Sequence, residues 1–444
     1  MTIHLSSHFT YSRLLRFVLP SVVMMIFTSI YGVVDGLFVS NFVGKAPFTA
    51  LNLIYPVLMI VGSLGFMIGT GGSALVSKTM GEGDGEGANR IFSMLVYVTV
   101  GLGVFFTLLG LIWIEPIAVL LGAEGEILAD CVLYGRILLL SQTAFMLQNV
   151  FQSFLITAER PHLGLIITVA AGVTNIVLDA VMVAVLRWGL AGAAVASALS
   201  QVVGGVVPLF YFLHPKNDSP LRLTRAGFDG RVLWRTCTNG SSELMSNISM
   251  SLVNMLYNLQ LIAVAGADGV AAYGVLMYIN FVFNAIFIGY AIGSAPIVSF
   301  HYGAENWAEV KNLFRKSMVI VALSGVIMTV LAEVLSGPLS SLFVGYDAGL
   351  CAMTRRGFQI FSLSFLMTGF NIFGSAFFTA LNDGVVSAVI SFLRTMVFQV
   401  AAVWILPVFL KLDGIWLSVA AAEALALLVT AGFLAAKRKV YHYI

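Results

Sequence analysis

Two carboxylates, an amide and a hydroxyl stand in stretches of sequence that are otherwise apolar enough to cross a membrane. Asp35 lies in YGVVDGLFVS, Asn175 and Asp179 lie in TNIVLDAVMV, and Ser197 lies in GLAGAAVASALSQ. An aspartate at the centre of a bilayer costs roughly 2.5 to 3.5 kcal/mol on insertion scales, so a carboxylate there indicates a functional site. These four side chains could bind an ion within the membrane.

The four side chains are also expected at one depth. Asn175 and Asp179 are four residues apart and share a helix face. At 1.5 Å per residue, all four lie about 7 to 12 Å from the membrane face opposite the N-terminus. Burial and a second nearby carboxylate both favour the protonated form of a carboxyl group, and the same oxygens suit Na⁺. We predict one ion site and favour H⁺ over Na⁺; the alternative is that these groups only join neighbouring helices.

A second polar set falls near the membrane midplane later in the chain. Glu243, Arg394 and Glu423 each lie far from a helix end, and an arginine at that depth needs a partner. We expect a structural ion pair between Arg394 and one of the two glutamates, with a substrate contact as the alternative. Arg136 could pair with the acids of the first site.

A cavity lining of aromatic, methionine and amide side chains is predicted from both halves. Such surfaces suit flat, lipophilic cations, although ordinary helix packing explains many of these residues equally well. Asn149 and Asn371 occupy equivalent places and also fit a structural or gating role. The substrate-contact candidates are Tyr31, Gln142, Asn149, Met277, Asn280, Phe281, Asn284, Asn371 and Arg394.

The composition requires a membrane protein. Of 444 residues 59% are hydrophobic and only 10% are charged, whereas a soluble domain carries about 25% charged residues. Twelve apolar runs are long enough to span a bilayer. They cover 14–40, 48–77, 89–113, 127–154, 162–186, 191–213, 233–264, 269–300, 310–333, 351–380, 384–409 and 414–436.

One polar segment divides these runs into two equal sets. We predict an N-terminal six-helix bundle at 1–213, a cytoplasmic linker at 214–231 and a C-terminal six-helix bundle at 232–444. Most loop lysines and arginines fall on the membrane side that both termini share. Because positively charged loops stay in the cytosol, we predict cytosolic termini and a location in the plasma (inner) membrane.

The two halves repeat one another at an offset of 222 residues. Asn149, Phe151 and Ser153 align with Asn371, Phe373 and Ser375. Six helices per half is an even number, so a pseudo-twofold axis must run along the membrane normal, as in transporters with parallel repeats. The predicted fold is therefore all-α, with twelve transmembrane helices in two bundles.

The ion site does not follow this repeat. The residues that align with Asp35, Asn175, Asp179 and Ser197 are Tyr257, Val397, Ala401 and Val419. Groups that merely hold the fold together should recur in both bundles, so the repeat favours a function for the first set.

Several other functions find no support in the sequence. The loop MGEGDGEGANR lacks the ending of a phosphate-binding loop, and three scattered cysteines have no metal-site spacing. We expect no enzyme, no cofactor, no bound metal other than the possible Na⁺, and no nucleic-acid partner. The predicted partners are the lipid bilayer and small cationic molecules, and the protein is expected to act as a monomer driven by an H⁺ or Na⁺ gradient.

Several segments together resemble the multidrug and toxin extrusion (MATE) family, in particular its bacterial MepA-like and DinF-like branch. These segments are SIYGVVDGLFVSNFVG, ALNLIYP, SALVSKTMGEGD, AERPHLG, TNIVLD and GLAGAAVASALSQ. The resemblance implies a V-shaped pair of six-helix bundles that exports organic cations in exchange for H⁺ or Na⁺. It also implies that the family's coupling residues correspond to Asp35, Asn175, Asp179 and Ser197.

One position departs from part of that family. The NorM-type sodium exchangers carry a glutamate midway along their seventh span, which corresponds to 233–264 here. This chain has Ser251 at that place, with Glu243 two turns earlier. A Na⁺ site of that kind is not expected in the second bundle. The predicted function is an ion-coupled multidrug antiporter working by alternating access; the alternatives are a flippase for lipid-linked oligosaccharides of the same superfamily and a passive channel.

Overall fold

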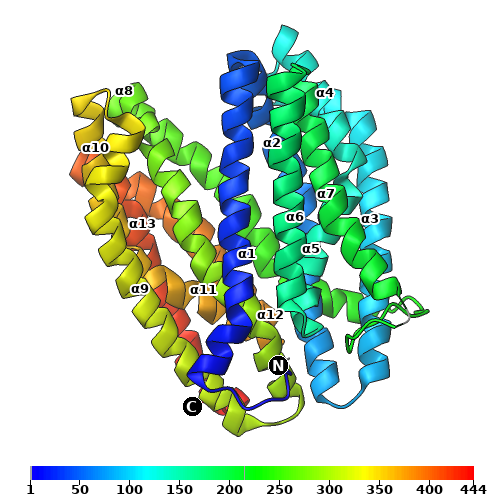
Figure 1. Ribbon diagram of the computed structural model, residues 1–444. Coiled ribbons are helices and arrows are strands. Elements are labelled where there is room, and N and C mark those ends of the chain that lie inside the picture. Colours follow the sequence, from blue (N-terminus) through cyan, green and yellow to red (C-terminus); the bar gives the residue numbers. More distant parts are fainter. Residues whose placement is uncertain (1–2, 215) are drawn as a thin grey trace.

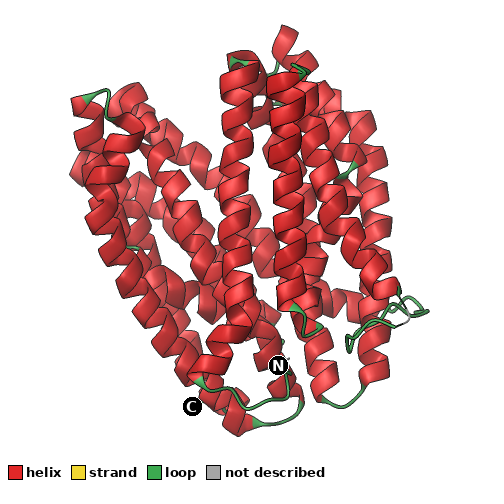
Figure 2. Ribbon diagram, viewed as in Figure 1, coloured by secondary structure: helices red, strands yellow, loops and turns green. Residues whose placement is uncertain are grey.

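The computed structural model is built of helices joined by short loops (Figures 1 and 2). It describes residues 3–214 and 216–444, and the side chains at 33, 36, 37, 40, 41 and 45 lie outside the description. The first half contains α1 (Tyr11–Phe38), η1 (Val39–Val43), α2 (Lys45–Gly81), α3 (Gly85–Leu120), α4 (Gly125–Leu140), α5 (Gln142–Thr157), α6 (Pro161–Asp179), η2 (Ala180–Val185) and α7 (Gly189–Leu213). The second half contains α8 (Gly230–Gly303), α9 (Trp307–Val344), α10 (Ala348–Ser362), α11 (Phe365–Ala380), α12 (Gly384–Phe392), η3 (Leu393–Val397) and α13 (Phe398–Tyr441).

The described part of the chain contains twelve membrane spans when long helices are divided at their breaks and bent helix pairs are joined. α8 contains a non-helical residue at Gly266 (φ 64°, ψ −152°) and therefore holds two spans. α12, η3 and α13 form one continuous stretch, Gly384–Tyr441, which a non-helical residue at Lys411 (φ 51°, ψ −127°) divides into two spans. α4 and α5 together form one span bent by 54°, and α10 and α11 form one bent by 48°. The predicted all-α fold with twelve spans in two bundles is confirmed.

The repeat seen in the sequence extends to the backbone of the turns. Gly44 and Gly266 align at the offset of 222 and both have positive φ, and the same holds for Gly189 and Lys411. Asp84 and Asn306 also align, and each accepts a hydrogen bond from the third residue of the helix that follows it. The acidic loop around Asp84 therefore starts a helix.

The two bundles approach closely at the end of the molecule that carries both termini (Figure 1). There Gly81 of α2 packs against the backbone of Phe300, and Gly303 of α8 packs against the backbone of Lys78. Gly81 aligns with Gly303 and Lys78 aligns with Phe300, so the contact is symmetric and the pseudo-twofold axis passes through it. A side chain at either glycine would push the bundles apart.

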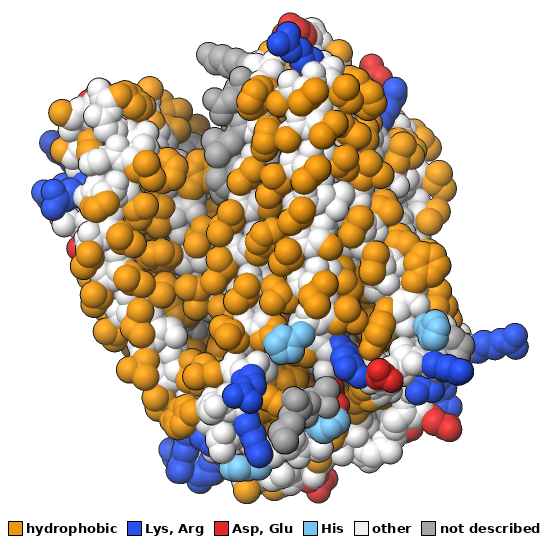
Figure 3. All heavy atoms as spheres, viewed as in Figure 1, with side chains coloured by type: hydrophobic (Ala, Val, Ile, Leu, Met, Phe, Trp, Pro, Cys, Tyr) orange, Lys and Arg blue, Asp and Glu red, His pale blue; other side chains and the backbone are white. Residues whose placement is uncertain are grey.

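At the opposite end the bundles separate, and a groove opens between them (Figure 3). The outer surface is covered by hydrophobic side chains along most of its length, while lysine, arginine and histidine side chains gather at the end that holds the termini (Figure 3). This distribution is that of an integral, multi-pass membrane protein.

The connection between the halves runs from the end of α7 at Leu213 to the start of α8 at Gly230. The first helix of the second half thus begins inside the segment predicted as a linker, because the Asp229 side chain accepts hydrogen bonds from the N–H groups of Arg231 and Val232. The boundaries proposed for the two bundles, at 213 and 232, stay a prediction.

Candidate functional sites in the two bundles

The four residues predicted to bind an ion converge in the first bundle. Asp35 comes from α1, Asn175 and Asp179 from α6, and Ser197 from α7. The Asp35 carboxyl group lies against the Asp179 carboxyl group and the Ser197 hydroxyl, and the Asn175 amide donates to the Ser197 hydroxyl oxygen at 3.3 Å. The side chains for which helix rise gave a common depth therefore lie together, and their role in binding an ion stays a prediction.

Several oxygens of this cluster lack a hydrogen-bond donor. Within the described residues, one oxygen of Asp35, both oxygens of Asp179 and the amide oxygen of Asn175 are buried without a hydrogen-bond partner. Two ionised carboxylates in contact repel each other, and buried acceptors without donors are costly. A proton or a cation between them would remove both penalties.

The backbone changes from α to π geometry next to each of these acids. η1 begins four residues after Asp35, and η2 begins at the residue after Asp179. Single turns of π-helix occur frequently at functional sites because the extra residue re-aims the neighbouring side chains. Hydropathy has no signal for such a turn, so the sequence did not predict it.

Further polar groups surround the cluster. Tyr31 of α1 interacts with Gln148 and lies near Asp35, and Tyr134 of α4 lies near both acids. Gln148 was missed although it stands beside Asn149 in an otherwise apolar helix. Arg136, which was expected to reach these acids, is exposed and forms no ion pair within the described residues; that expectation is wrong.

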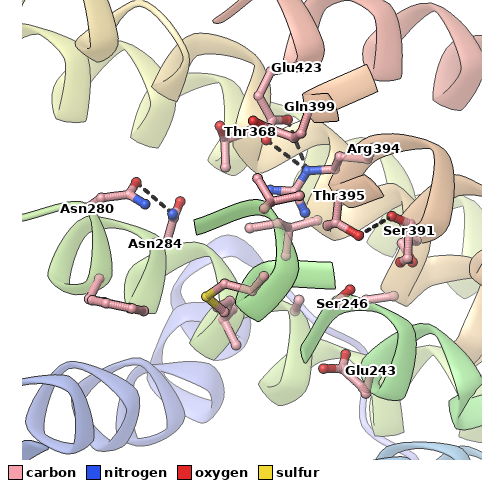
Figure 4. Close-up of a pocket in the computed structure, with 18 of the residues that line it drawn as sticks. Glu243, Ser246, Asn280, Asn284, Thr368, Ser391, Arg394, Thr395, Gln399 and Glu423 are labelled. Carbon is pink, nitrogen blue, oxygen red and sulfur yellow. Dashed lines mark hydrogen bonds and ion pairs between the residues drawn. The ribbon is translucent and has the colours of Figure 1, made fainter. Parts of the chain in front are cut away.

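A cavity of about 250 Å³ lies mainly in the second bundle (Figure 4). It is lined by both spans of α8 and by residues of α11, η3 and α13, with Thr70, Ser73 and Ser153 from the first bundle at its border. Three charged side chains line it, and they are Glu243, Arg394 and Glu423.

Arg394 is paired with Glu423 at one edge of this cavity. Its Nε lies 2.9 Å from one carboxylate oxygen and 3.0 Å from the other (Figure 4). The Asn371 amide donates to Glu423 at 2.7 Å, and the Thr430 hydroxyl donates to the Asn371 oxygen at 3.0 Å. Asn371 therefore supports the ion pair and lies outside the cavity lining.

The remaining predicted substrate contacts divide into two groups. Met277, Asn280, Phe281 and Asn284, together with Arg394, line the cavity, whereas Tyr31, Gln142, Asn149 and Asn371 do not. Gln142 is buried and donates to the Leu58 carbonyl at 3.2 Å. The second group was selected by residue type, which does not reveal the direction in which a helix faces.

A run of hydroxyl and amide side chains in the cavity wall was also missed. It includes Ser246, Thr368, Ser391, Thr395 and Gln399 (Figure 4). Tyr257 donates to Gln399 at 2.8 Å and stacks on Tyr273 with ring centroids 5.1 Å apart. The lining therefore offers aromatic faces and hydrogen-bonding groups side by side.

Metal binding by clustered side chains is not indicated. In residues 3–214 and 216–444, no group of three or more histidine, cysteine, aspartate or glutamate side chains is placed to hold a metal ion. The predicted absence of a cofactor stays a prediction.

Comparison with known proteins gives the family. The MatE family model matches residues 20–181 and 244–405, once in each half of the chain. The chain belongs to the MatE family. The double match agrees with the repeat, and it places this MatE protein among membrane transporters and not among enzymes.

Individual relatives of this MatE protein are distant but cover nearly all of it. It is 23% identical over 406 residues to the multidrug export protein MepA of Staphylococcus saprophyticus, covering 91% of this chain and 88% of the relative. It is 22% identical over 418 residues to MepA of Staphylococcus aureus strain MRSA252, covering 94% and 92%. A solved structure described as the outward-facing conformation of a multidrug resistance MATE family transporter shares the fold, with a TM-score of 0.91, 24% identity, and 98% and 96% of the two chains covered.

Proposed function

We propose that this MatE protein exports lipophilic organic cations from the cytosol in exchange for H⁺, or less favourably Na⁺, by opening alternately on the two sides of the plasma membrane. The observation that carries the proposal is the buried cluster of Asp35 and Asp179. Within the described residues three of its four carboxylate oxygens lack a hydrogen-bond partner, and the counterparts of both acids in the other bundle are uncharged. The curated relatives named as multidrug export proteins support the substrate class.

The geometry supports an outward-open state. The bundles touch at the end that carries the termini, and the groove opens at the other end (Figures 1 and 3). With the termini in the cytosol, as the loop charges predict, the groove faces outward, so the ion cluster and the cavity would be reached from outside the cell.

Coupling follows if ion and drug favour opposite states of one equilibrium. A proton shared by Asp35 and Asp179 removes the repulsion between two carboxylates. The protonated pair would therefore favour a closer packing of α1 against α6 than the ionised pair does. The drug and the ion would then have different affinities for the two packings. Ion binding would therefore promote release of the drug to the outside. H⁺ is favoured because two neighbouring carboxyl groups can share a proton.

The test is ethidium efflux from proteoliposomes under an imposed pH gradient and then under an imposed Na⁺ gradient. Wild-type protein should export ethidium against its gradient, with a larger response to H⁺, and Asp35→Asn should reduce that response at least tenfold. Asp268→Asn removes an exposed acid and serves as the matched control.

The same vesicles separate the proposal from its alternatives. Accumulation that never exceeds equilibrium would indicate a passive channel, and transfer of a labelled lipid-linked sugar without ethidium export would indicate a flippase. Undiminished coupled export by Asp35→Asn would exclude the ion cluster as the coupling site.

A further inference from the structure

The three charged side chains of the second-bundle cavity are not equally paired. Glu423 is held by Arg394 and Asn371, so both of its carboxylate oxygens have donors. Glu243 of α8 lines the same cavity, yet in the described part of the chain its carboxylate has neither an ion pair nor a hydrogen bond. Figure 4 shows Glu243 beside Ser246, on the side of Arg394 away from Glu423.

This arrangement leaves an excess negative charge in the cavity. Two carboxylates and one guanidinium face it. The guanidinium is bound to Glu423 through its Nε and attracts Glu243 only from beyond ion-pair distance. An ionised carboxylate that shares its only nearby cation with a second carboxylate is costly inside a membrane protein unless another cation or polar partner reaches it. A single positive charge close to Glu243 would neutralise the set.

The fold itself does not require these charges. At the offset of 222, the counterparts of Glu243, Arg394 and Glu423 in the first bundle are Ser21, Gly172 and Gln201. The first bundle thus reaches the same architecture with uncharged residues. A helix-joining role explains the Arg394–Glu423 pair but leaves Glu243 without a structural reason.

Other parts of the cavity that Glu243 lines have surfaces that suit an aromatic cation. Met250, Met277 and Phe281 line the cavity together with the stacked rings of Tyr257 and Tyr273. Methionine and aromatic faces bind flat rings by apolar contact and attract positive charge through the ring electrons. A pocket of this kind, mostly apolar with a few polar groups, is typical of small-molecule sites.

We propose that Glu243 binds the positive centre of the transported molecule and selects monovalent aromatic cations for this cavity. The inference rests on the proposed export function but assigns a different residue to a different task. Asp35 and Asp179 bind the coupling ion in the first bundle, and Glu243 binds the substrate in the second. Substrate and ion therefore act through separate carboxylates.

The first experiment measures binding without transport. Ethidium is titrated into purified, detergent-solubilised protein and its fluorescence anisotropy is followed for wild type, Glu243→Gln, Glu243→Asp and the control Asp268→Asn. Glu243→Gln should raise the ethidium Kd at least tenfold, Glu243→Asp should raise it less, and Asp268→Asn should leave it unchanged. An unchanged Kd in Glu243→Gln would overturn the assignment.

The second experiment separates charge recognition from damage to the cavity. N-phenyl-1-naphthylamine, an uncharged aromatic probe, is titrated into the same variants and should bind wild type and Glu243→Gln with equal affinity. Equal weakening of the neutral and the cationic probe would mean that Glu243 maintains the cavity shape, and the assignment would then be wrong.

The outcomes distinguish this inference from the function on which it rests. If wild type exports ethidium and Asp35→Asn does not, while Glu243→Gln binds ethidium normally, only the assignment of Glu243 fails. If wild type neither binds nor exports ethidium, the export proposal and the assignment fail together.

Discussion

Glu159 and Glu309 are held in the same way by one short segment, although they lie in different bundles. The Nδ1 of His4 and the N–H of Leu5 each lie 2.7 Å from an oxygen of Glu159, which precedes α6. The Nδ1 of His8 and the N–H of Phe9 lie 2.6 and 2.8 Å from the oxygens of Glu309 in α9. The N-terminal segment (residues 3–10) thus bridges the bundles where they meet.

The contact with Glu309 should contribute measurably to stability. Glu309→Gln replaces one acceptor oxygen by an amide donor that faces either the Phe9 N–H or His8, and hydrogen bonds to a charged group contribute about 1.5 to 3 kcal/mol. We expect a lower apparent Tm in detergent for Glu309→Gln and no change for Glu305→Gln, which alters an exposed acid four residues earlier. Equal Tm values for the two variants would contradict the bridging role.

Small residues at the symmetric contact should be required for the bundles to meet. A Cβ at Gly81 or Gly303 would collide with backbone of the other bundle, and overpacking of this kind costs about 1 to 3 kcal/mol. Gly81→Ala and Gly303→Ala should lower the apparent Tm. Gly101→Ala is the control, because nothing lies within 4 Å of a Cβ there and the change should be neutral or slightly stabilising.

The pair of Arg394 and Glu423 should behave as a buried unit. Arg394→Met leaves the Glu423 charge without its cation, and breaking a buried ion pair costs about 3 to 5 kcal/mol. Adding Glu423→Gln should recover part of that loss, which a double-mutant cycle of apparent Tm values measures. Arg356→Met breaks an exposed pair with Asp413 and should have no measurable effect.

Asp179 should carry the response to the ion gradient together with Asp35. Asp179→Asn keeps the shape of the side chain but cannot take up a proton. Acidifying the medium outside proteoliposomes that hold ethidium should accelerate export by wild type and leave the rate of Asp179→Asn unchanged. A retained pH response in this variant would assign H⁺ coupling to another group.

Much of the fold could be predicted because a membrane protein built of apolar runs can cross the bilayer only as helices. Apolar runs and loop charges are long-range signals, and the offset of 222 fixed the symmetry of the bundles. The interruptions at Gly266 and Lys411 were placed only as gaps between runs, because hydropathy does not report backbone angles.

The candidate sites were predicted unevenly for physical reasons. Helix rise gave a common depth for Asp35 and Asp179, so their proximity followed from simple geometry. Which face of a helix Gln142 or Asn149 presents depends on bends and π turns, and the sequence does not show these. The partner of Glu309 lies about 300 residues away in the chain, and no local pattern indicates such a contact.

The symmetric glycine contact lies at one end of the long helix α2, far from the open end of the groove. Gly81 and Gly303 each pack against backbone of the other bundle at one end of α2, so a bundle that tilted about this contact would pivot at that end. The other end of α2 is about 54 Å away at 1.5 Å per residue, so a tilt of about 10° would move it by about 9 Å. If the bundles rock as proposed, a small repacking at this contact would produce a much larger movement at the open end of the groove.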